Sequence, residues 1–331
     1  MAVIKVGING FGRIGRRVFR LLLDHPGIEV VAINDIADAK TLSHLVKYDS
    51  IHGVLQKQVQ STTHSIKVDD KVYPFYSQTE ISKIPWRGVD IVIEATGKFK
   101  TKSVLQQHIS SGAKKVILCV PPVDDQIKMI VAGVNDQMLT PEDCIISNAS
   151  CTTNNAAPML KLIHDAFQVQ QAYITTVHSY TTDQSLHDQP HKDLRRARAA
   201  GQSIVPTTTG AAKALTKLFP DLNNVIGGCG IRVPVANGSL CDITLNVKKE
   251  TSIKAVNALF EKAAAGPLKG ILQFTQDPIV SIDIVGNYHS CVLDSEMTSV
   301  IGKMIKIIGW YDNETGYSSR IIDLVYKMSR K

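Results

Sequence analysis

Short apolar runs alternate with helix-spaced residues through the first half of the chain. Residues 3–8 form an apolar run that predicts a buried strand, and residues 28–33 form a second one. Between the two runs, apolar side chains recur at helical spacing, at Ile14, Val18, Leu21 and Leu22. The order strand, helix, strand is typical of a parallel sheet with crossover helices.

Two further apolar runs extend this pattern. Residues 89–97 and 115–120 predict two more strands, each of which ends in turn-forming residues. We therefore expect an α/β domain with a Rossmann-type, doubly wound parallel sheet. Because such sheets bind ligands at the carboxyl ends of their strands, Thr96, Gly97 and Cys119 are candidates for contact with a cofactor.

The pattern changes after a short apolar run at residues 144–146. A helix follows it, with apolar positions between residues 156 and 167, and residues 173–178 predict a strand. Beyond a polar segment at 179–201, we expect helices at 211–218 and 318–328 and long alternating strands at 240–247 and 304–310. This half therefore predicts an α+β domain with a mainly antiparallel sheet.

With 331 residues, the chain is long enough for two domains, each with its own core. We expect a dinucleotide-binding domain at 1–150 and a catalytic domain at 151–315. The sequence has no internal repeat and no low-complexity linker between them. The boundary is therefore expected near Cys151, without a flexible connector.

Composition narrows the possible functions. Hydrophobic residues make up 44% of the chain and charged residues 20%, which is typical of a globular enzyme. The net charge of +7 favours anionic ligands, but lysines and arginines are dispersed apart from a small cluster at 195–198. A dedicated nucleic-acid-binding protein would usually concentrate its basic residues on one face. We expect no dedicated nucleic-acid partner.

The six cysteines form no C-x-x-C pair and show no metal-ligand spacing, which indicates reduced thiols and a cytoplasmic protein. The first residues enter a strand without the profile of a secretory signal. No apolar run approaches the ~20 residues that span a membrane. His187 and His191 lack a nearby cysteine or glutamate partner, so we expect no metal site.

A glycine-rich turn follows the first strand. Gly10, Gly12 and Gly15 form G-x-G-x-x-G between a strand and a helix, the arrangement that binds a dinucleotide pyrophosphate at the helix N-terminus. Asp35 lies about 20 residues further on, after the second strand. Its carboxylate would accept hydrogen bonds from the adenosine ribose and repel a 2′-phosphate, which favours NAD over NADP. Alternatively, Asp35 is a loop carboxylate that begins a turn.

The candidate nucleophile is Cys151, which lies between hydroxyl residues where a strand gives way to a helix. Helix-terminal N–H groups lower the pKa of a thiol from its usual value of roughly 8.5. The alternative is a buried structural cysteine. His178 ends the next predicted strand and is a candidate base, because a thiol paired with an imidazole is a recurring activated nucleophile. A lone histidine is otherwise more often structural.

Residues 147–154, which contain Cys151, resemble the active-site segment of phosphorylating glyceraldehyde-3-phosphate dehydrogenases, and the resemblance covers nearly the whole chain. Residues 175–181 resemble the catalytic-histidine strand of that family. The resemblance implies NAD-dependent oxidation of D-glyceraldehyde 3-phosphate to 1,3-bisphosphoglycerate through a thioester on Cys151, a step of glycolysis and gluconeogenesis, with His178 as the base.

The resemblance also implies further ligand-binding residues. The cofactor would contact the glycine turn with Phe11, Arg13 and Ile14, and its nicotinamide would meet Asn313 and Tyr317. The substrate phosphate would bind Thr181, Asp183 and Arg232. The attacking inorganic phosphate would bind Ser150, Thr152, Arg196, Thr209 and Gly210. Without the resemblance, these residues read as surface turns and solvated arginines. The family also implies a homotetramer and packing of helix 316–331 on the first domain.

Several positions differ from the family pattern. Asn155 replaces a second cysteine, Cys119 replaces a serine, and Thr315 replaces a tryptophan. Gln189 stands before Pro190, where NAD-specific members usually have leucine, and Val235 replaces a threonine. None of these changes removes a catalytic residue, but they are expected to alter cofactor affinity. With Asn155 in place of the second cysteine, the intrachain disulfide that other members can form is not possible.

Two alternative functions stay open at this point. One is the related erythrose-4-phosphate dehydrogenase, which shares the glycine turn and a serine after the histidine. That family lacks the Thr-Thr-Thr-Gly element that residues 207–210 retain. The other is a catalytically idle polyanion-binding protein. The positive net charge suggests this function, whereas the presence of both Cys151 and His178 argues against it.

Overall fold

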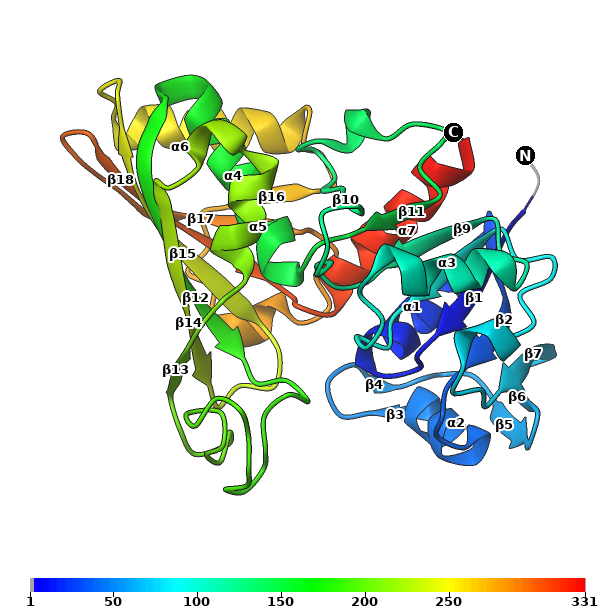
Figure 1. Cartoon of the computed structure of the whole chain (residues 1–331). Coiled ribbons are helices and arrows are strands. Elements are labelled where there is room, and N and C mark those ends of the chain that lie inside the picture. Colours follow the sequence, from blue (N-terminus) through cyan, green and yellow to red (C-terminus); the bar gives the residue numbers. More distant parts are fainter. Residues whose placement is uncertain (1–2, 331) are drawn as a thin grey trace. The chain divides into compact units, whose positions relative to one another are not determined.

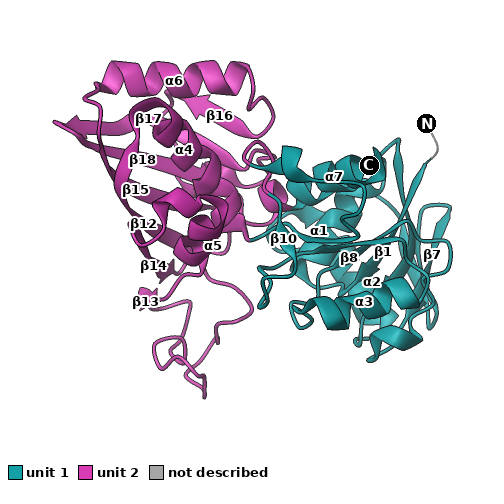
Figure 2. Ribbon diagram, turned by 45° about the horizontal axis from the view of Figure 1, so that its top comes forward, with its two compact units in different colours: residues 1–130, 135–149, 318–331 teal, residues 131–134, 150–317 magenta. Residues whose placement is uncertain are grey.

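The computed structural model describes residues 3–330, which form two compact units (Figure 2). Residues 3–130, 135–149 and 318–330 belong to the first unit, and residues 131–134 and 150–317 to the second. Within the described residues, no helix has the length and apolar character needed to cross a membrane.

The first unit contains a nine-stranded sheet in the order β10-β11-β9-β8-β1-β2-β7-β6-β5 (Figure 1). Its strands are β1 (Ile4–Asn9), β2 (Ile28–Asn34), β5 (Val59–Thr62), β6 (Ser65–Val68), β7 (Lys71–Tyr76), β8 (Ile91–Glu94), β9 (Lys115–Leu118), β10 (Lys128–Met129) and β11 (Ile145–Ser147). From β10 to β7 all neighbours are parallel, and β7, β6 and β5 pair antiparallel.

The helices of this unit are α1 (Arg13–Leu22), α2 (Ala39–Lys47) and α3 (Lys102–Ser110), with short turns η1 (Ile81–Lys83) and η2 (Asp136–Met138) and a small pair of strands, β3 (Tyr48–Asp49) and β4 (Gly53–Val54). Asp38 begins α2 because its carboxylate accepts the Thr41 N–H at 2.8 Å. Trp86, Val92, Leu105 and Val116 belong to a fully buried core that joins α3 to the sheet.

The second unit contains a seven-stranded sheet in the order β13-β14-β12-β15-β18-β17-β16. Its strands are β12 (Val169–Ser179), β13 (Val205–Thr207), β14 (Ile226–Val233), β15 (Ser239–Val247), β16 (Leu272–Thr275), β17 (Cys291–Ile301) and β18 (Met304–Tyr311). The pairs β12–β14 and β16–β17 are parallel and the other neighbours antiparallel.

Helices α4 (Cys151–Phe167), α5 (Ala211–Leu218) and α6 (Ile253–Ala265) pack on this sheet, and η3 (Pro220–Leu222) and η4 (Ser281–Ile284) are short turns. The predicted combination of a Rossmann-type parallel sheet with a mainly antiparallel α+β domain is therefore confirmed. In the polar segment at 179–201, Ser179 ends β12, and residues 180–201 form neither helix nor strand.

The C-terminal helix α7 (Thr315–Arg330) begins three residues before its predicted start at residue 318, because Thr315 is buried although it is polar and so gave no amphipathic signal. From residue 318 onward it belongs to the first unit. There Lys115 Nζ donates to the Met328 carbonyl at 2.8 Å, and the Tyr326 hydroxyl lies 3.2 Å from His25 Nδ1.

Candidate active site

A tight turn places Cys151 at the first position of helix α4. The Ser150 hydroxyl accepts the Thr153 N–H at 3.1 Å and so caps the helix. Ala149, just before the cap, has a φ of +53°, a left-handed conformation that costs a non-glycine residue on the order of 1 kcal/mol or more. The first N–H groups of α4 have no partner within the helix and can stabilise negative charge beside the sulfur.

The two candidate catalytic side chains lie together. His178 lies on strand β12, and the Nε2 atom of its ring is 3.4 Å from the Cys151 Sγ. The residues are 27 positions apart in the chain, so this proximity depends on how α4 packs against the sheet. The contact has the geometry of a nucleophile and its base.

Burial controls the charge of this pair. It lowers the pKa of His178 to about 3, and the positive charge of Arg232 acts in the same direction. Burial raises the pKa of the Cys151 thiol, while Arg232 and hydrogen bonds from Thr152 oppose that rise. Both shifts favour the uncharged forms of the pair, so burial outweighs the lowering of the thiol pKa that was expected from the helix start.

Two arginines supply positive charge next to the pair. Arg232, on β14, donates from Nη1 to the Ser179 carbonyl at 2.9 Å, and the same atom lies 2.6 Å from His178 Nδ1. Arg196, in the 179–201 segment, donates from Nε to Thr207 Oγ1 at 2.9 Å and forms an ion pair with Asp183. Guanidinium groups in such positions suit phosphate oxygens.

The other residues expected at phosphate sites fall into two groups. Gly210 caps α5, and Thr209 accepts the Ala211 N–H at 3.3 Å, so both lie at a helix start. In contrast, the Thr152 hydroxyl is buried, lies 3.0 Å from the Tyr311 hydroxyl and acts on the Cys151 thiol together with the Thr152 main chain. Thr181 is partly exposed, and Asp183 is exposed beside Arg196.

Two residues, Tyr311 and Asn155, connect helix α4 to the sheet, and no periodic pattern in the sequence indicated these contacts. The buried Tyr311 hydroxyl lies between Thr152 and Thr176, at 3.0 and 2.9 Å, and so joins α4 to β12 and β18. Asn155 donates from Nδ2 to the carbonyls of Gly309 and Trp310, both at 3.2 Å. The residue that replaces the family's second cysteine therefore ties α4 to β18.

Asn313 is oriented by two buried serines. Its Oδ1 accepts hydrogen bonds from Ser179 Oγ at 2.8 Å and Ser239 Oγ at 3.1 Å. An amide whose oxygen is engaged in this way presents its NH₂ as a donor. Tyr317 is buried in the first turn of α7.

In the first unit, the glycine turn has the shape that a dinucleotide needs. Gly10 has a φ of +90°, and a Cβ there would lie 2.5 Å from the Thr96 nitrogen. A Cβ on Gly15 would lie 2.1 Å from the Gly10 carbonyl oxygen, whereas one on Gly12 would meet nothing within 4 Å. Gly10 and Gly15 therefore close the turn, and Gly12 leaves room for a pyrophosphate at the start of α1.

A pocket of about 300 Å³ adjoins this turn and is lined by Gly10, Gly12, Asp35 and Thr96 among others. Asp35 accepts the Phe11 N–H at 2.6 Å through Oδ2 and the Ala37 N–H at 3.0 Å through Oδ1. The carboxylate therefore also holds the glycine turn against β2. The pocket, the open side of Gly12 and this carboxylate fit a dinucleotide.

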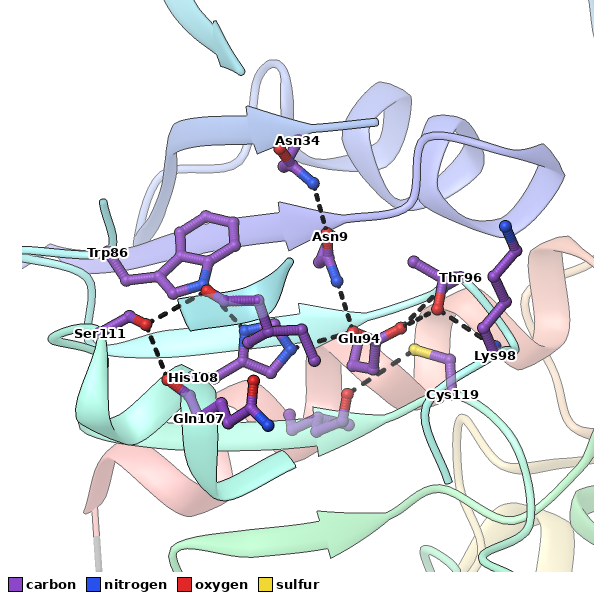
Figure 3. A network of polar contacts seen from close by, with 12 residues as sticks. Asn9, Asn34, Trp86, Glu94, Thr96, Lys98, Gln107, His108, Ser111 and Cys119 are labelled. Carbon is purple, nitrogen blue, oxygen red and sulfur yellow. Dashed lines mark hydrogen bonds and ion pairs between the residues drawn. The ribbon is translucent and has the colours of Figure 1, made fainter. Parts of the chain in front are cut away.

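A buried polar network lies beneath this pocket (Figure 3). Glu94 Oε2 accepts from Asn9 Nδ2 at 2.6 Å and lies 3.0 Å from His108 Nε2, while Oε1 accepts the Thr96 N–H at 2.9 Å. Trp86 Nε1 donates to His108 Nδ1 at 2.8 Å, so the ring proton of His108 is on Nε2 and faces Glu94. No local sequence pattern indicated this network, which fixes the loop that begins at Thr96.

Three other residues expected to contact the cofactor are Arg13, Cys119 and Gly97. The Arg13 guanidinium forms an ion pair with Asp49, with Nη1 to Oδ2 at 2.8 Å. Cys119 is buried, and burial raises the pKa of its thiol well above the usual value. Gly97 has a φ of +68° in the loop after Glu94. Within residues 3–330, no cluster of three or more metal-ligating side chains is present.

The Rossmann-type fold and the glycine turn define a class of protein, a nicotinamide-dinucleotide-dependent dehydrogenase. Comparison with known proteins gives the family. The family model described as "Glyceraldehyde 3-phosphate dehydrogenase, NAD binding domain" matches residues 4–102. The family model for the C-terminal domain of the same enzyme matches residues 150–313. The chain belongs to the glyceraldehyde-3-phosphate dehydrogenase family.

Individual relatives match over nearly their whole length. The chain is 51% identical to glyceraldehyde-3-phosphate dehydrogenase 2 of Streptomyces avermitilis over 326 residues, which are 97% of each chain. It is 48% identical to glyceraldehyde-3-phosphate dehydrogenase of Geobacillus stearothermophilus and 46% identical to glyceraldehyde-3-phosphate dehydrogenase 1 of Bacillus cereus, with 99% of each chain covered in both comparisons.

Proposed function

We propose that this chain is an NAD-dependent, phosphorylating dehydrogenase that converts D-glyceraldehyde 3-phosphate to 1,3-bisphosphoglycerate in glycolysis and gluconeogenesis. The observation that carries the proposal is the 3.4 Å contact between Cys151 Sγ and His178 Nε2, at a helix start and beside an arginine. We infer the reaction and the cofactor, NAD, from the membership of the chain in the glyceraldehyde-3-phosphate dehydrogenase family.

The chemistry begins at the sulfur. Cys151 transfers its proton to His178 and attacks the aldehyde carbon, which gives a hemithioacetal whose oxyanion meets the N–H groups at the start of α4. The protonated His178 returns this proton to the oxyanion, which gives the hemithioacetal hydroxyl and a neutral imidazole. That imidazole then accepts the hydroxyl proton again as the carbon is oxidised to a thioester. Inorganic phosphate displaces the acyl group, and the thiolate leaves.

The dinucleotide would be held by the glycine turn with Phe11, Arg13 and Ile14, by Asp35, and by Thr96, Gly97 and Cys119. When bound, its nicotinamide accepts the hydride that leaves the hemithioacetal carbon. Asn313 would donate its amide N–H to the carboxamide of the ring, and Tyr317 would pack nearby. Ser179 and Ser239 hold that amide in the required orientation.

Two sites would hold the anions. Arg232 with Thr181 and Asp183 would receive the phosphate of the aldehyde. Arg196 with Thr209, Gly210, Ser150 and the main chain of Thr152 would receive the attacking phosphate. The ion pair between Asp183 and Arg196 supports a role for that carboxylate in holding a guanidinium rather than in touching an anion.

Further parts of the proposal follow from the family resemblance, the cysteine pattern and the dispersed basic residues. We infer a dinucleotide-binding domain at 1–150, completed by helix 316–331, and a catalytic domain at 151–315. The chain would act as a cytoplasmic homotetramer without a dedicated nucleic-acid partner. The polar segment at 179–201 is long for a connection that serves one chain only, so a subunit contact would explain it. Sedimentation that gave only monomer at micromolar concentration would contradict the tetramer.

The test of the function is cofactor reduction with the triose phosphate and phosphate present. Cys151→Ser should abolish oxidation and leave NAD binding largely intact, because a serine hydroxyl is far less acidic than a thiol. Cys144→Ser is the matched control, since this exposed thiol lies outside the site. Substantial turnover by Cys151→Ser would refute the assigned nucleophile.

The alternatives give different results in the same experiment. A higher kcat/KM for erythrose 4-phosphate than for the triose phosphate would identify the related dehydrogenase. Salt-dependent RNA binding without any cofactor reduction would identify a polyanion-binding protein.

A further inference from the structure

Arg196, the arginine expected at the site of the attacking phosphate, is held by three neighbours. Its Nε donates to Thr207 Oγ1 at 2.9 Å, its Nη2 donates to the Thr208 carbonyl at 3.3 Å, and its Nη1 forms the ion pair with Asp183. A guanidinium has five N–H groups, so one N–H on each Nη is left for an anion. The direction of these two N–H groups is therefore set by the three contacts that hold the rest of the guanidinium.

The Thr207 hydroxyl connects Arg196 to a carboxylate. It lies 2.7 Å from Asp193 Oδ2, to which it donates, and it accepts from Arg196 Nε, because a guanidinium N–H can only donate. The hydrogen bond from Thr207 is the main cause of the lowered pKa of Asp193, so the group at the end of this chain is an ionised carboxylate near neutral pH. The roles of donor and acceptor are therefore the same at every step from Arg196 to Asp193.

Asp193 acts on Arg196 indirectly, in two ways. Its Oδ2 is 3.7 Å from Arg196 Nε, which is beyond hydrogen-bond distance, so the side chain is reached through Thr207. Its Oδ1 accepts the Arg195 N–H at 2.9 Å, and its carbonyl accepts the Ala197 N–H at 3.1 Å. Asp193 therefore also begins the backbone turn that carries Arg196.

Thr207 is the point at which this turn is attached to the sheet. It is buried and ends strand β13, where it pairs with Gly230 of β14. Asp193 and Arg196, in contrast, belong to residues 180–201, which form neither helix nor strand. One hydroxyl on a strand therefore gives a loop arginine a defined position against the sheet that also carries the proposed base.

We propose that Asp193 and Thr207 are positioning residues for the second half of the reaction, which hold the Arg196 guanidinium in the orientation that binds the attacking phosphate. This proposal rests on the proposed function, which places that phosphate at Arg196. The aldehyde is oxidised before the phosphate attacks the thioester. Loss of the network should therefore weaken the use of phosphate and leave the oxidation step unchanged.

Kinetics separate the two halves of the reaction. NAD reduction in a single turnover without inorganic phosphate measures oxidation, and steady-state turnover measures the KM for phosphate. Thr207→Val replaces the hydroxyl by a methyl group and should raise that KM about tenfold, the effect of losing one hydrogen bond to a charged group, with the single-turnover rate of the parent. Thr207→Ser keeps the hydroxyl and should keep the KM of the parent.

The single-turnover rate also shows that each variant is folded. Thr216→Val is the matched control, since Thr216 is on α5 and its hydroxyl donates to the Lys213 carbonyl at 2.9 Å. It should leave both quantities unchanged. An equal KM for phosphate in Thr207→Val and Thr207→Ser, or an equal loss in the single-turnover rate, would overturn the proposal.

A double-variant cycle tests whether Asp193 acts through Thr207. In Asp193→Asn the amide cannot accept from both the Arg195 N–H and the Thr207 hydroxyl, so the KM for phosphate should rise. Thr207→Val should then have a smaller effect in Asp193→Asn than in the parent, because the two changes break the same chain of contacts. Fully additive effects would show that the two residues act independently.

Asp188→Asn is the control for this cycle, since Asp188 is in the same segment and is paired with Arg198. It should leave the KM for phosphate unchanged.

Titration calorimetry with inorganic phosphate tests the network without turnover. The parent and Thr207→Ser should bind phosphate alike, and Thr207→Val should bind it more weakly. Equal affinities of the two Thr207 variants, or no binding by the parent, would overturn the proposal. If the parent oxidises no aldehyde, the proposed function fails, while the calorimetry still decides whether the Thr207 hydroxyl supports an anion site at Arg196.

Discussion

The Ser179 hydroxyl donates a hydrogen bond to the Oδ1 of Asn313 at 2.8 Å, across 134 positions of sequence. Ser179 is fully buried, and its carbonyl oxygen lies 2.7 Å from Nδ1 of His178, the proposed base. One residue therefore connects the proposed base to the amide that would receive the nicotinamide. This relationship gives the first prediction.

Ser179→Ala should weaken NAD binding by about 3–10-fold, the effect of losing one hydrogen bond worth roughly 0.5–1.5 kcal/mol. Ser239 still holds the Asn313 amide in that variant, so the double variant Ser179→Ala with Ser239→Ala should bind NAD more weakly again. Titration calorimetry with NAD measures both. Unchanged affinity in the double variant would show that the serines do not orient Asn313.

The burial of His178 should make the protein sensitive to acid. Its pKa falls from about 6.5 in the unfolded chain to about 3 in the folded protein, so between these values only the unfolded chain binds the proton. Stability is therefore unaffected above about pH 6.5 and is lost as the pH falls below it. At pH 5 the loss from this one group would be about 2 kcal/mol.

The measurement is urea unfolding at pH 7 and pH 5. His178→Gln should show a smaller drop in midpoint between the two pH values than the parent, because it has no ring to protonate. His187→Gln is the control, since His187 is exposed and should follow the parent. An equal drop in the parent and in His178→Gln would show that protonation of His178 in the unfolded chain does not cause the loss of stability at pH 5.

The sequence predicted the elements well because their signals are local. Helix α5 was predicted with its observed bounds, and the strands around the glycine turn were placed within a residue or so. The glycine spacing was equally informative, since the approach of Gly15 to the Gly10 carbonyl is a property of one short turn.

Contacts between distant segments were not predictable in the same way. The Asn155 hydrogen bonds to Gly309 and Trp310 cross more than 150 positions, and no local pattern indicates them. Glu94 appeared as one polar residue at the end of an apolar strand, without a sign that three side chains would meet around it. Such contacts depend on the register of the sheets, which periodicity alone does not determine.

Glu94→Gln tests whether this buried network supports the cofactor pocket. All the neighbours of its carboxyl group donate, so an amide NH₂ would face an N–H of Asn9, Thr96 or His108. Leaving a buried donor unpaired costs roughly 1–3 kcal/mol, and the freed Thr96 loop should weaken NAD binding. Urea unfolding and NAD titration measure the two effects.

The control for Glu94 is Glu80→Gln, which changes an exposed carboxylate paired with Lys83. It should alter neither property measurably. If Glu94→Gln were as stable as Glu80→Gln and bound NAD equally well, the network would have no supporting role.

The choice between NAD and NADP should depend mainly on Asp35. Its carboxylate lines the pocket beside the glycine turn, where a 2′-phosphate would meet a like charge, a juxtaposition that costs several kcal/mol. Gln189, the residue that could favour NADP, already donates its amide to Ser185. A neutral hydrogen bond nets only about 0.5–1.5 kcal/mol, so the repulsion should dominate and the enzyme should prefer NAD.

Because Asp35 also accepts the Phe11 N–H at 2.6 Å, removing its side chain takes away both the negative charge and this hydrogen-bond acceptor. Asp35→Gly should gain NADP use but lose total activity, since the glycine turn loses that acceptor. Asp35→Asn removes the charge and can still accept from Phe11, so it should shift kcat/KM toward NADP with a smaller loss. Equal use of both cofactors by the parent, or no gain in NADP use by either variant, would show that Asp35 does not set the preference.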